Sequence, residues 1–202
     1  MAYALLIRHA QNDWVSKNRL AGWTPGVHLN DAGLKQAEQL AKRLSDLPLR
    51  ALYSSPLERC IETAAPVAAL HDIEITLLEA VGEVRYGKWE GKKIKKLSKK
   101  PAWFTIQHFP SRFRFPDGES LLEVQHRAVA AIESLSLHHK DDMIAIVSHA
   151  DVIKLVLAHY LGMHIDLFQR LTVSTASASL LALPGNGSVR VLRINDHGPI
   201  EP

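Results

Sequence analysis

Two arginines and two histidines follow short apolar runs, at points where the chain is expected to leave a sheet. Arg8 and His9 follow "YALLI", Arg59 follows "ALYSSPLE", and His149 follows "MIAIVS". In an open α/β sheet the carboxyl ends of the strands border one crevice, so these side chains are expected to converge there. Guanidinium forks bind the oxygens of a phosphoryl group bidentately, and a neutral imidazole can attack phosphorus. Together the four residues are typical of phosphoryl chemistry.

Each of these residues also has an ordinary structural interpretation when it is taken alone. Arg8 could be an edge residue that reaches solvent, Arg59 a surface residue of a helix, and the two histidines hydrogen-bonded core residues. Their joint occurrence at strand ends favours the chemical interpretation. His149 falls where a helix should begin, so the backbone amide of the neighbouring Ala150 is suited to bind an anion.

The elements that must position these groups are indicated by the apolar periodicity. Short strand-like runs alternate with longer helical stretches, which predicts a three-layer α/β/α fold with a largely parallel central sheet. The expected strands are 3–7, 51–53, 73–78, 143–147, 179–183 and 189–194. Asn30 is expected to cap a helix whose apolar face includes Leu34 and Leu44. "SPLE" (55–58) and "SLLE" (120–123) have the spacing of capping boxes, which would place Pro56 at a first helical position.

Length and composition predict one globular domain over residues 1–202, because 202 residues with 47% hydrophobic and 22% charged side chains can bury a full core. The net charge of +3 suits a small phosphorylated metabolite, and it lacks the concentrated basic charge of a nucleic-acid-binding protein. The sequence shows no signal peptide or membrane-spanning run. The single cysteine, Cys60, indicates a reducing compartment, so we expect a cytoplasmic protein. The oligomeric state is not predicted.

One stretch, from about residue 88 to residue 116, departs from the alternation and becomes basic and aromatic. It contains "GKKIKKLSKKPAWF" followed by "FPSRFRFPDG". We expect it to form a small basic insertion over the active site. Its lysines surround Ile94 and Leu97, a pattern that fits the solvated face of a short helix better than direct substrate contact.

Five segments resemble the histidine phosphatase superfamily, whose members are also called phosphoglycerate mutase-like proteins. "LIRHAQNDW" is similar to L-x-R-H-G-E-T-x-W, "SSPLERCIETA" to S-S-P-L-x-R-A-x-x-T-A, and "EVRYGKWEG" to E-x-x-x-G-x-W-E-G, while "PDGES" and "IVSHADVI" match later blocks. The resemblance implies a phosphatase that hydrolyses small phosphomonoesters without a metal or other cofactor. It implies His9 as the nucleophile that forms a phosphohistidine, with Arg8, Arg59 and His149 holding the phosphate.

The same resemblance selects one of three neighbouring glutamates as the proton donor. Glu79, Glu83 and Glu90 all follow the third expected strand, and only the spacing of Glu83 to Gly87 and to "WEG" matches the family pattern. Glu83 would protonate the leaving alkoxide and then, as a base, activate water against the phosphohistidine. The nearby anionic phosphate is expected to raise the pKa of this carboxyl group.

Departures from the family pattern include Ala10, which replaces the glycine after His9, and the loss of two phosphate-contacting amides. A phosphate-binding asparagine of many relatives is Val15 here, and a glutamine of their next loop is Ala21. Asn12, Asn18 and His28 are candidates to replace these amide contacts, although each is also a common turn or capping residue.

Two other functions stay open at this point. A cofactor-dependent phosphoglycerate mutase uses the same core when the phosphoenzyme is shielded from water, but this short chain leaves little room for the mutase insertions. A non-catalytic phosphate-binding module would need neither His9 nor Glu83. The sequence does not name the substrate, and phosphoserine, sugar phosphates, ribazole phosphate and a broad range of esters all remain candidates.

Overall fold

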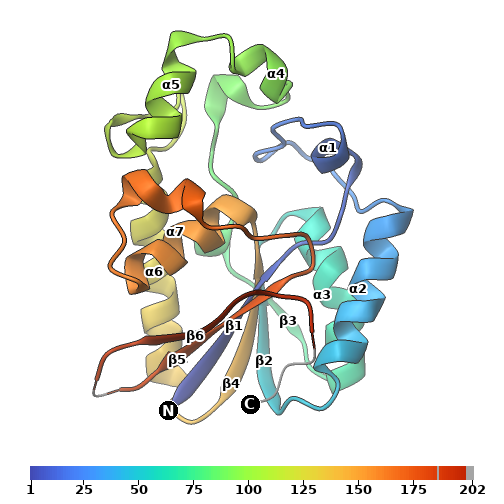
Figure 1. The fold of residues 1–202 in the computed structure, drawn as a ribbon. Helices are drawn as coiled ribbons and strands as arrows, with labels where there is room; N and C mark the ends of the chain where they lie inside the picture. Colours follow the sequence, from blue (N-terminus) through green and yellow to red (C-terminus); the bar gives the residue numbers. More distant parts are fainter. Residues whose placement is uncertain (186, 199–202) are drawn as a thin grey trace.

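The computed structural model describes residues 1–185 and 187–198, and their strands form one six-stranded sheet in the order β3-β2-β4-β1-β5-β6 (Figure 1). Strands β1 to β4 are parallel, whereas β5 is antiparallel to β1 and β6 is antiparallel to β5. The bounds are β1 (Ala2–Arg8), β2 (Leu49–Ser54), β3 (Ile75–Leu77), β4 (Met143–Ser148), β5 (Ala178–Leu183) and β6 (Arg190–Asp196). All six strands were predicted, with small differences at their ends.

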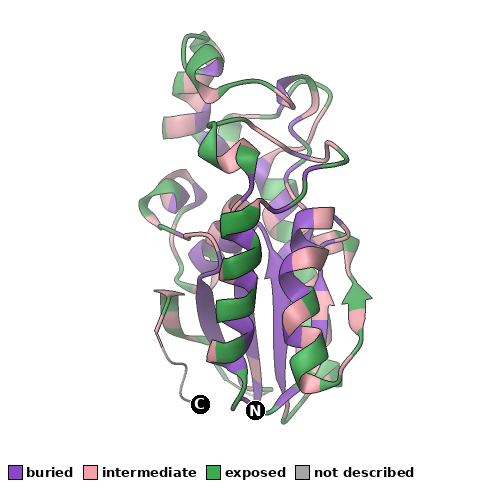
Figure 2. Cartoon of the chain, turned by 90° about the vertical axis from the view of Figure 1, so that its right-hand side faces the viewer, coloured by how far each residue is buried: buried purple, intermediate pink, exposed green. Residues whose placement is uncertain are grey.

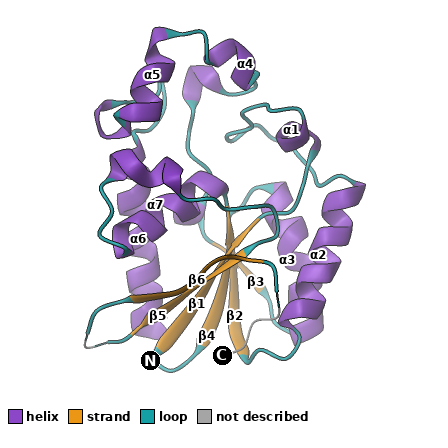
Figure 3. Ribbon diagram, in the orientation of Figure 1, coloured by secondary structure: helices purple, strands orange, loops and turns teal. Residues whose placement is uncertain are grey.

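Helices cover both faces of this sheet, α2 and α3 on one side and α6 and α7 on the other (Figure 3). The α-helices are α1 (Asp13–Ser16), α2 (Asp31–Leu44), α3 (Glu58–His71), α4 (Ile94–Leu97), α5 (Pro101–His108), α6 (Leu121–His138) and α7 (Ala150–Tyr160). Short 3-10 helices are η1 (Glu79–Val81), η2 (Gly87–Trp89), η3 (Pro110–Arg112) and η4 (Ile165–Arg170). In the described residues, no helix has the length and apolar character needed to cross a membrane.

The side chains of β1 alternate between two cores, as the pleat of a strand requires. Ala4 and Leu6 pack in the core that contains α6 and α7, whereas Leu5 and Ile7 pack in the core that contains α2 and α3. The central strands are therefore buried on both faces (Figure 2). This confirms the predicted α/β/α layering. It also explains why polar residues begin only where β1 and β4 end.

Two of the three predicted helix caps are present. The Asn30 side chain accepts a hydrogen bond from the Gly33 amide, and Ser120 and Glu123 form a complete capping box at the start of α6. A β-carbon at Gly33 would lie 1.9 Å from the carbonyl oxygen of Gln11, so only glycine lets α2 pack against the loop that follows β1. Leu34, expected on the apolar face, is exposed.

The predicted capping box at "SPLE" is wrong. Helix α3 begins at Glu58, its N-cap is Leu57, and no side chain caps it. Pro56 therefore precedes the helix. The Ser55 hydroxyl does not cap the helix because it is hydrogen-bonded to Nε2 of His149, 2.8 Å away, at the strand ends.

The segment 88–116 stands beyond the carboxyl ends of the parallel strands and includes α4, α5 and η3 (Figure 1). Backbone hydrogen bonds join it to the loop after α1: the Ile94 amide donates to the Asn18 carbonyl at 2.9 Å, and the Leu20 amide to the Lys92 carbonyl at 3.0 Å. Leu97 is buried, whereas the six lysines around it are exposed, as predicted.

Candidate active site

A pocket of about 220 Å³ opens at the carboxyl ends of the parallel strands, and we call it the phosphate pocket. Its lining includes most of the predicted site residues, namely Arg8, His9, Asn12, Asn18, Arg59, Glu83 and Ala150. Ile94 of the insertion also lines it, so the insertion borders the site as expected. The predicted convergence of residues from separate strand ends is therefore observed.

His9 is held as a neutral imidazole with one free ring nitrogen. Its Nδ1 lies 2.8 Å from the carbonyl oxygen of Ala10. Since a carbonyl oxygen only accepts, Nδ1 carries the proton and the lone pair is left on Nε2. Burial lowers the pKa of His9 well below its usual range, and the charges of Arg59 and Arg8 lower the pKa further. A neutral imidazole with a free Nε2 is the form that can attack an electrophile.

The two arginines are anchored through one nitrogen each. Nη1 of Arg8 donates to the carbonyl oxygen of Val173 at 2.7 Å, and Nη2 of Arg59 donates to the carbonyl oxygen of Gly22 at 2.9 Å. Arg59 is only 1% exposed and is the second residue of α3. These backbone contacts fix both guanidinium planes at the pocket.

Three buried donors that belong to the pocket lining have no hydrogen-bond partner within the described residues. They are Nε of Arg8, Nη1 of Arg59 and Nδ2 of Asn12. A buried donor left without an acceptor costs about 1–3 kcal/mol, and more when it is charged. Among the described residues, the only other buried side-chain nitrogen or oxygen without a hydrogen-bond partner is Nε of Arg43, which lies outside the pocket. An anion with several acceptor oxygens would satisfy all three donors at once.

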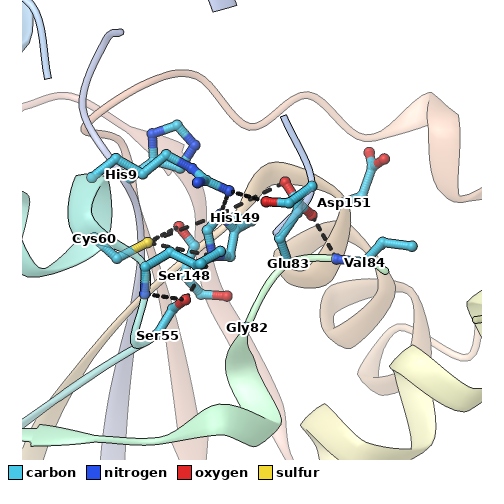
Figure 4. A network of polar contacts seen from close by, with 12 residues as sticks. His9, Ser55, Cys60, Gly82, Glu83, Val84, Ser148, His149 and Asp151 are labelled. Atoms are coloured by element: carbon cyan, nitrogen blue, oxygen red, sulfur yellow. Dashed lines mark hydrogen bonds and ion pairs between the residues drawn. The ribbon is translucent and has the colours of Figure 1, made fainter. Parts of the chain in front are cut away.

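His149 is completely buried and does not line the phosphate pocket. Figure 4 shows it in the network of polar contacts that includes Glu83 and Cys60. Nη2 of Arg59 approaches Nδ1 of His149 at 3.3 Å, and since arginine only donates, Nδ1 accepts. Nε2 then carries the proton and donates to Ser55 Oγ at 2.8 Å. Burial, Arg59 and His9 lower the pKa of His149 well below its usual range. In this arrangement both ring nitrogens have protein partners, so a direct phosphate contact by His149 stays a prediction.

Glu83 has the electrostatic character of a proton donor. Burial raises its pKa to about 7, and the nearby carboxylate of Asp151 contributes to that rise against the opposing effect of Arg59. Its Oε1 accepts a hydrogen bond from the Val84 amide at 3.0 Å, and its Oε2 lies 3.6 Å from Nδ1 of His149 (Figure 4). The carboxyl group can therefore both hold and release a proton near neutral pH.

The backbone that carries Glu83 is fixed by Arg127 of α6. Its guanidinium donates to the carbonyl oxygens of Ala80, Gly82 and Glu83 at 2.7, 2.9 and 3.0 Å. The carboxylate of Glu119 holds Arg127 in turn, with Nε to Oε1 at 2.8 Å. Sequence reasoning missed both residues, because neither lies in the segment that carries the acid.

Of the four residues predicted to bind substrate, three line the pocket and one lies outside it. Asn12, Asn18 and Ala150 line the pocket. The side-chain oxygen of Asn12 caps α1 by accepting from the amides of Trp14 and Val15, which leaves its Nδ2 free for a ligand. His28 does not line the pocket. It is exposed and paired with Glu62, with 2.5 Å between Nδ1 and Oε1, so the structure gives it a surface role in place of a substrate contact.

Sequence reasoning also missed Tyr86 and Asp151 as part of this site. Both line the phosphate pocket, and the Tyr86 hydroxyl donates to Asp151 Oδ2 at 2.9 Å. The only available signal for Asp151 was its place directly after "SHA", and acidic residues are common in the first turn of a helix for reasons of charge alone.

Comparisons with known proteins agree with this geometry. The model of the histidine phosphatase superfamily (branch 1) matches residues 4–197. Phosphoserine phosphatase 1 of Hydrogenobacter thermophilus is 29% identical over 96% of this chain and 92% of that protein. A 2,3-bisphosphoglycerate-dependent phosphoglycerate mutase of Thermoplasma acidophilum is 26% identical over 90% of this chain and 87% of that protein. The solved structure of Bacillus stearothermophilus YhfR is 28% identical, covers all of both chains and superposes with a TM-score of 0.91.

The fold and the pocket thus define an α/β enzyme of phosphoryl chemistry with two histidines and two arginines at its strand ends. The chain belongs to the histidine phosphatase superfamily. It is a phosphoric monoester hydrolase of that type.

Proposed function

We propose that this protein hydrolyses small phosphomonoesters through a phosphohistidine formed on His9. The observation that carries the proposal is the set of unpaired buried donors on Arg8, Arg59 and Asn12, which line one pocket with the free Nε2 of His9. A phosphoryl group has the several acceptor oxygens that this set requires. Its phosphorus is the electrophile that a neutral imidazole attacks.

The proposed reaction has two steps. In the first, Nε2 of His9 attacks phosphorus, the bond to the leaving oxygen breaks, and Glu83 gives its proton to the departing alkoxide. In the second, the Glu83 carboxylate takes a proton from water, whose oxygen attacks the phosphohistidine, and phosphate leaves with His9 neutral again. Arg8 and Arg59 stabilise the transferring phosphoryl group throughout. His149 has a positioning role, because it accepts a hydrogen bond from Arg59 and is itself held by Ser55.

We also propose that the partner is a small phosphorylated metabolite and that the enzyme acts in the cytoplasm. Support for the partner comes from the size of the phosphate pocket and its arginine-rich lining. Support for the location comes from the single cysteine, which is buried and unpaired.

A turnover screen separates hydrolysis from the two alternative functions. The purified protein is expected to release inorganic phosphate from several phosphomonoesters, with and without a chelator. A mutase would instead interconvert phosphoglycerates with little phosphate release, and its phosphohistidine would be long-lived in water. A binding module would retain phosphomonoesters without consuming them. Either of the last two results would replace the proposed hydrolysis.

Glu83→Gln tests the proposed acid through the identity of the leaving group. An alkoxide needs a proton in the transition state, whereas p-nitrophenolate leaves readily without one. The burst rate of the variant is therefore expected to fall by about 10²- to 10⁴-fold with alkyl phosphates and far less with p-nitrophenyl phosphate. Single-turnover measurements are needed, because the second step should slow with both substrates. Equal burst-phase losses would move the acid elsewhere, to Glu79 or Glu90.

The pH profile of the same pair of proteins provides an independent readout. The proton-donating form of Glu83 is present below its pKa of about 7 and is lost as the pH rises through that value. For alkyl phosphates kcat/KM of the wild type should therefore decline above about pH 7. Glu83→Gln has no such proton to lose, so this decline should be absent in the variant. A variant with an unchanged alkaline limb would assign that limb to another group.

A further inference from the structure

A second pocket adjoins the phosphate pocket, and the reaction proposed above gives it no role. It has a volume of about 270 Å³ and lies between the insertion and the main body of the protein. We call it the aromatic pocket because Trp89, Trp103, Phe115 and Phe168 line it. The two pockets share part of their lining, which consists of Leu20, Tyr86, Ile94 and Asp151.

The lining of the aromatic pocket has no positive charge. Among the described residues that line it, none is a lysine, arginine or histidine, and the polar ones are Tyr86, Gln107, Gln169 and Asp151. Asp151 is the only charged one, and it accepts the hydrogen bond of the Tyr86 hydroxyl. Lys154, which does not line the pocket, places its Nζ 3.6 Å from Oδ1 of Asp151 and donates to Oε1 of Gln169 at 3.1 Å, so this cation is already paired. A substrate carboxylate in the pocket would lie beside Asp151 with no unpaired cation in the lining, which is unfavourable in a shielded site. The pocket is therefore suited to an uncharged group.

Part of the passage from one pocket to the other is also apolar. Leu20 and Ile94 belong to the shared lining, and Val15 and Ala21 add apolar surface to the phosphate pocket. Apart from the two phosphate-binding arginines, Arg19 is the only lysine or arginine in the described lining of the phosphate pocket. Its Nε donates to the Gly91 carbonyl at 3.0 Å, and its guanidinium lies 4.2 Å from the centre of the Trp14 ring.

We propose that the aromatic pocket receives the leaving group, so that the preferred substrates are phosphomonoesters of uncharged aromatic or other bulky apolar alcohols. This inference rests on the proposed phosphatase function. The phosphoryl group is held by Arg8 and Arg59, and the organic part extends past Leu20 and Ile94 toward the rings of Trp89 and Trp103. Gln107 and Gln169 offer hydrogen bonds to a hydroxyl or amide on that alcohol.

The substrate test compares leaving groups of similar acidity and different size. Phenyl phosphate and 2-naphthyl phosphate differ by one fused ring, so a difference between them mainly reports contact with the protein. For the wild type kcat/KM is expected to be about 10-fold or more higher for the naphthyl ester, since each extra apolar group in a fitted pocket contributes on that scale. Phosphoserine and 3-phosphoglycerate, whose leaving groups carry a carboxylate, are expected to be poor substrates.

The variant test uses two neighbouring residues of α5. Trp103 lines the aromatic pocket, whereas Phe104 is 59% exposed and does not line it. Trp103→Ala is expected to remove most of the preference for naphthyl over phenyl phosphate. Phe104→Ala is expected to keep the wild-type preference. Gln107→Lys, which adds a cation to the pocket, should raise kcat/KM for 3-phosphoglycerate and lower it for naphthyl phosphate.

The outcomes separate this inference from the proposed function. Turnover of phosphoserine above that of naphthyl phosphate would overturn the leaving-group assignment and leave the phosphatase function intact, and loss of that activity in Arg19→Ala would place the leaving group beside Arg19. Equal losses for all esters in Trp103→Ala, or an equal effect of Phe104→Ala, would also overturn it. Absence of hydrolysis with every ester, p-nitrophenyl phosphate included, would instead contradict the proposed function.

Discussion

His9→Ala is expected to lower phosphatase turnover by about 10⁴-fold or more, because removal of a nucleophile deletes the covalent route altogether. The side chain is 4% exposed and its ring makes one hydrogen bond, to the Ala10 carbonyl, so the variant should fold normally. Steady-state assays with p-nitrophenyl phosphate measure the loss. Circular dichroism and thermal unfolding check that the fold is kept.

His28→Ala is the matched control for this variant. His28 is a candidate from the same part of the sequence, but the structure places it on the surface beside Glu62 and outside the pocket. Its replacement is expected to change turnover by less than about 2-fold. Near wild-type activity in His9→Ala would contradict the covalent mechanism, and a large loss in His28→Ala would return that residue to the site.

Arg59→Lys is also expected to cause a large loss of activity. The lysine keeps the charge but offers one ammonium group where the guanidinium offers a planar fork, so it cannot contact the Gly22 carbonyl, His149 and a phosphoryl oxygen with the same geometry. Transition-state stabilisation is expected to fall by about 2–5 kcal/mol, which corresponds to about 30- to 5000-fold in kcat/KM. Arg8→Lys should behave similarly.

Arg43→Lys controls for the loss of a partly buried arginine elsewhere. Arg43 also has a buried Nε without a partner in the described chain, and its Nη2 donates to the Asp196 carbonyl at 3.2 Å. It does not line the phosphate pocket, so its replacement should leave kcat/KM unchanged. Full activity in Arg59→Lys would contradict the phosphate-binding role proposed for the guanidinium group of Arg59.

The features that could be predicted from the sequence are those encoded over short distances along the chain. Apolar runs located all six strands, and the polar residues at or shortly after the strand ends placed Arg8, His9 and Arg59 at the pocket. The spacing within "EVRYGKWEG" placed Glu83 there as well. At Gly87 a β-carbon would lie 2.2 Å from the carbonyl oxygen of Pro116, so the motif requires glycine at this position for steric reasons.

The features that could not be predicted depend on partners far apart in the sequence. Tyr86 and Asp151 are 65 positions apart, and His149 takes the Ser55 hydroxyl from 94 positions away, which removes the expected helix cap. The pairing of His28, which lies in a loop, with Glu62 of α3 was missed for the same reason. Local spacing contains no information on such pairs, since the tertiary fold brings them together.

Chemical identification of the phosphorylated residue is the most direct test of the phosphohistidine on His9. Wild-type protein is mixed with radiolabelled phosphomonoester, quenched in base during the first turnover, digested and analysed by mass spectrometry. The phosphate is expected to be stable in base and labile in acid, to be located on His9, and to be absent from His9→Ala. Phosphate on another residue, or turnover without any phosphoenzyme in a rapid quench, would contradict it.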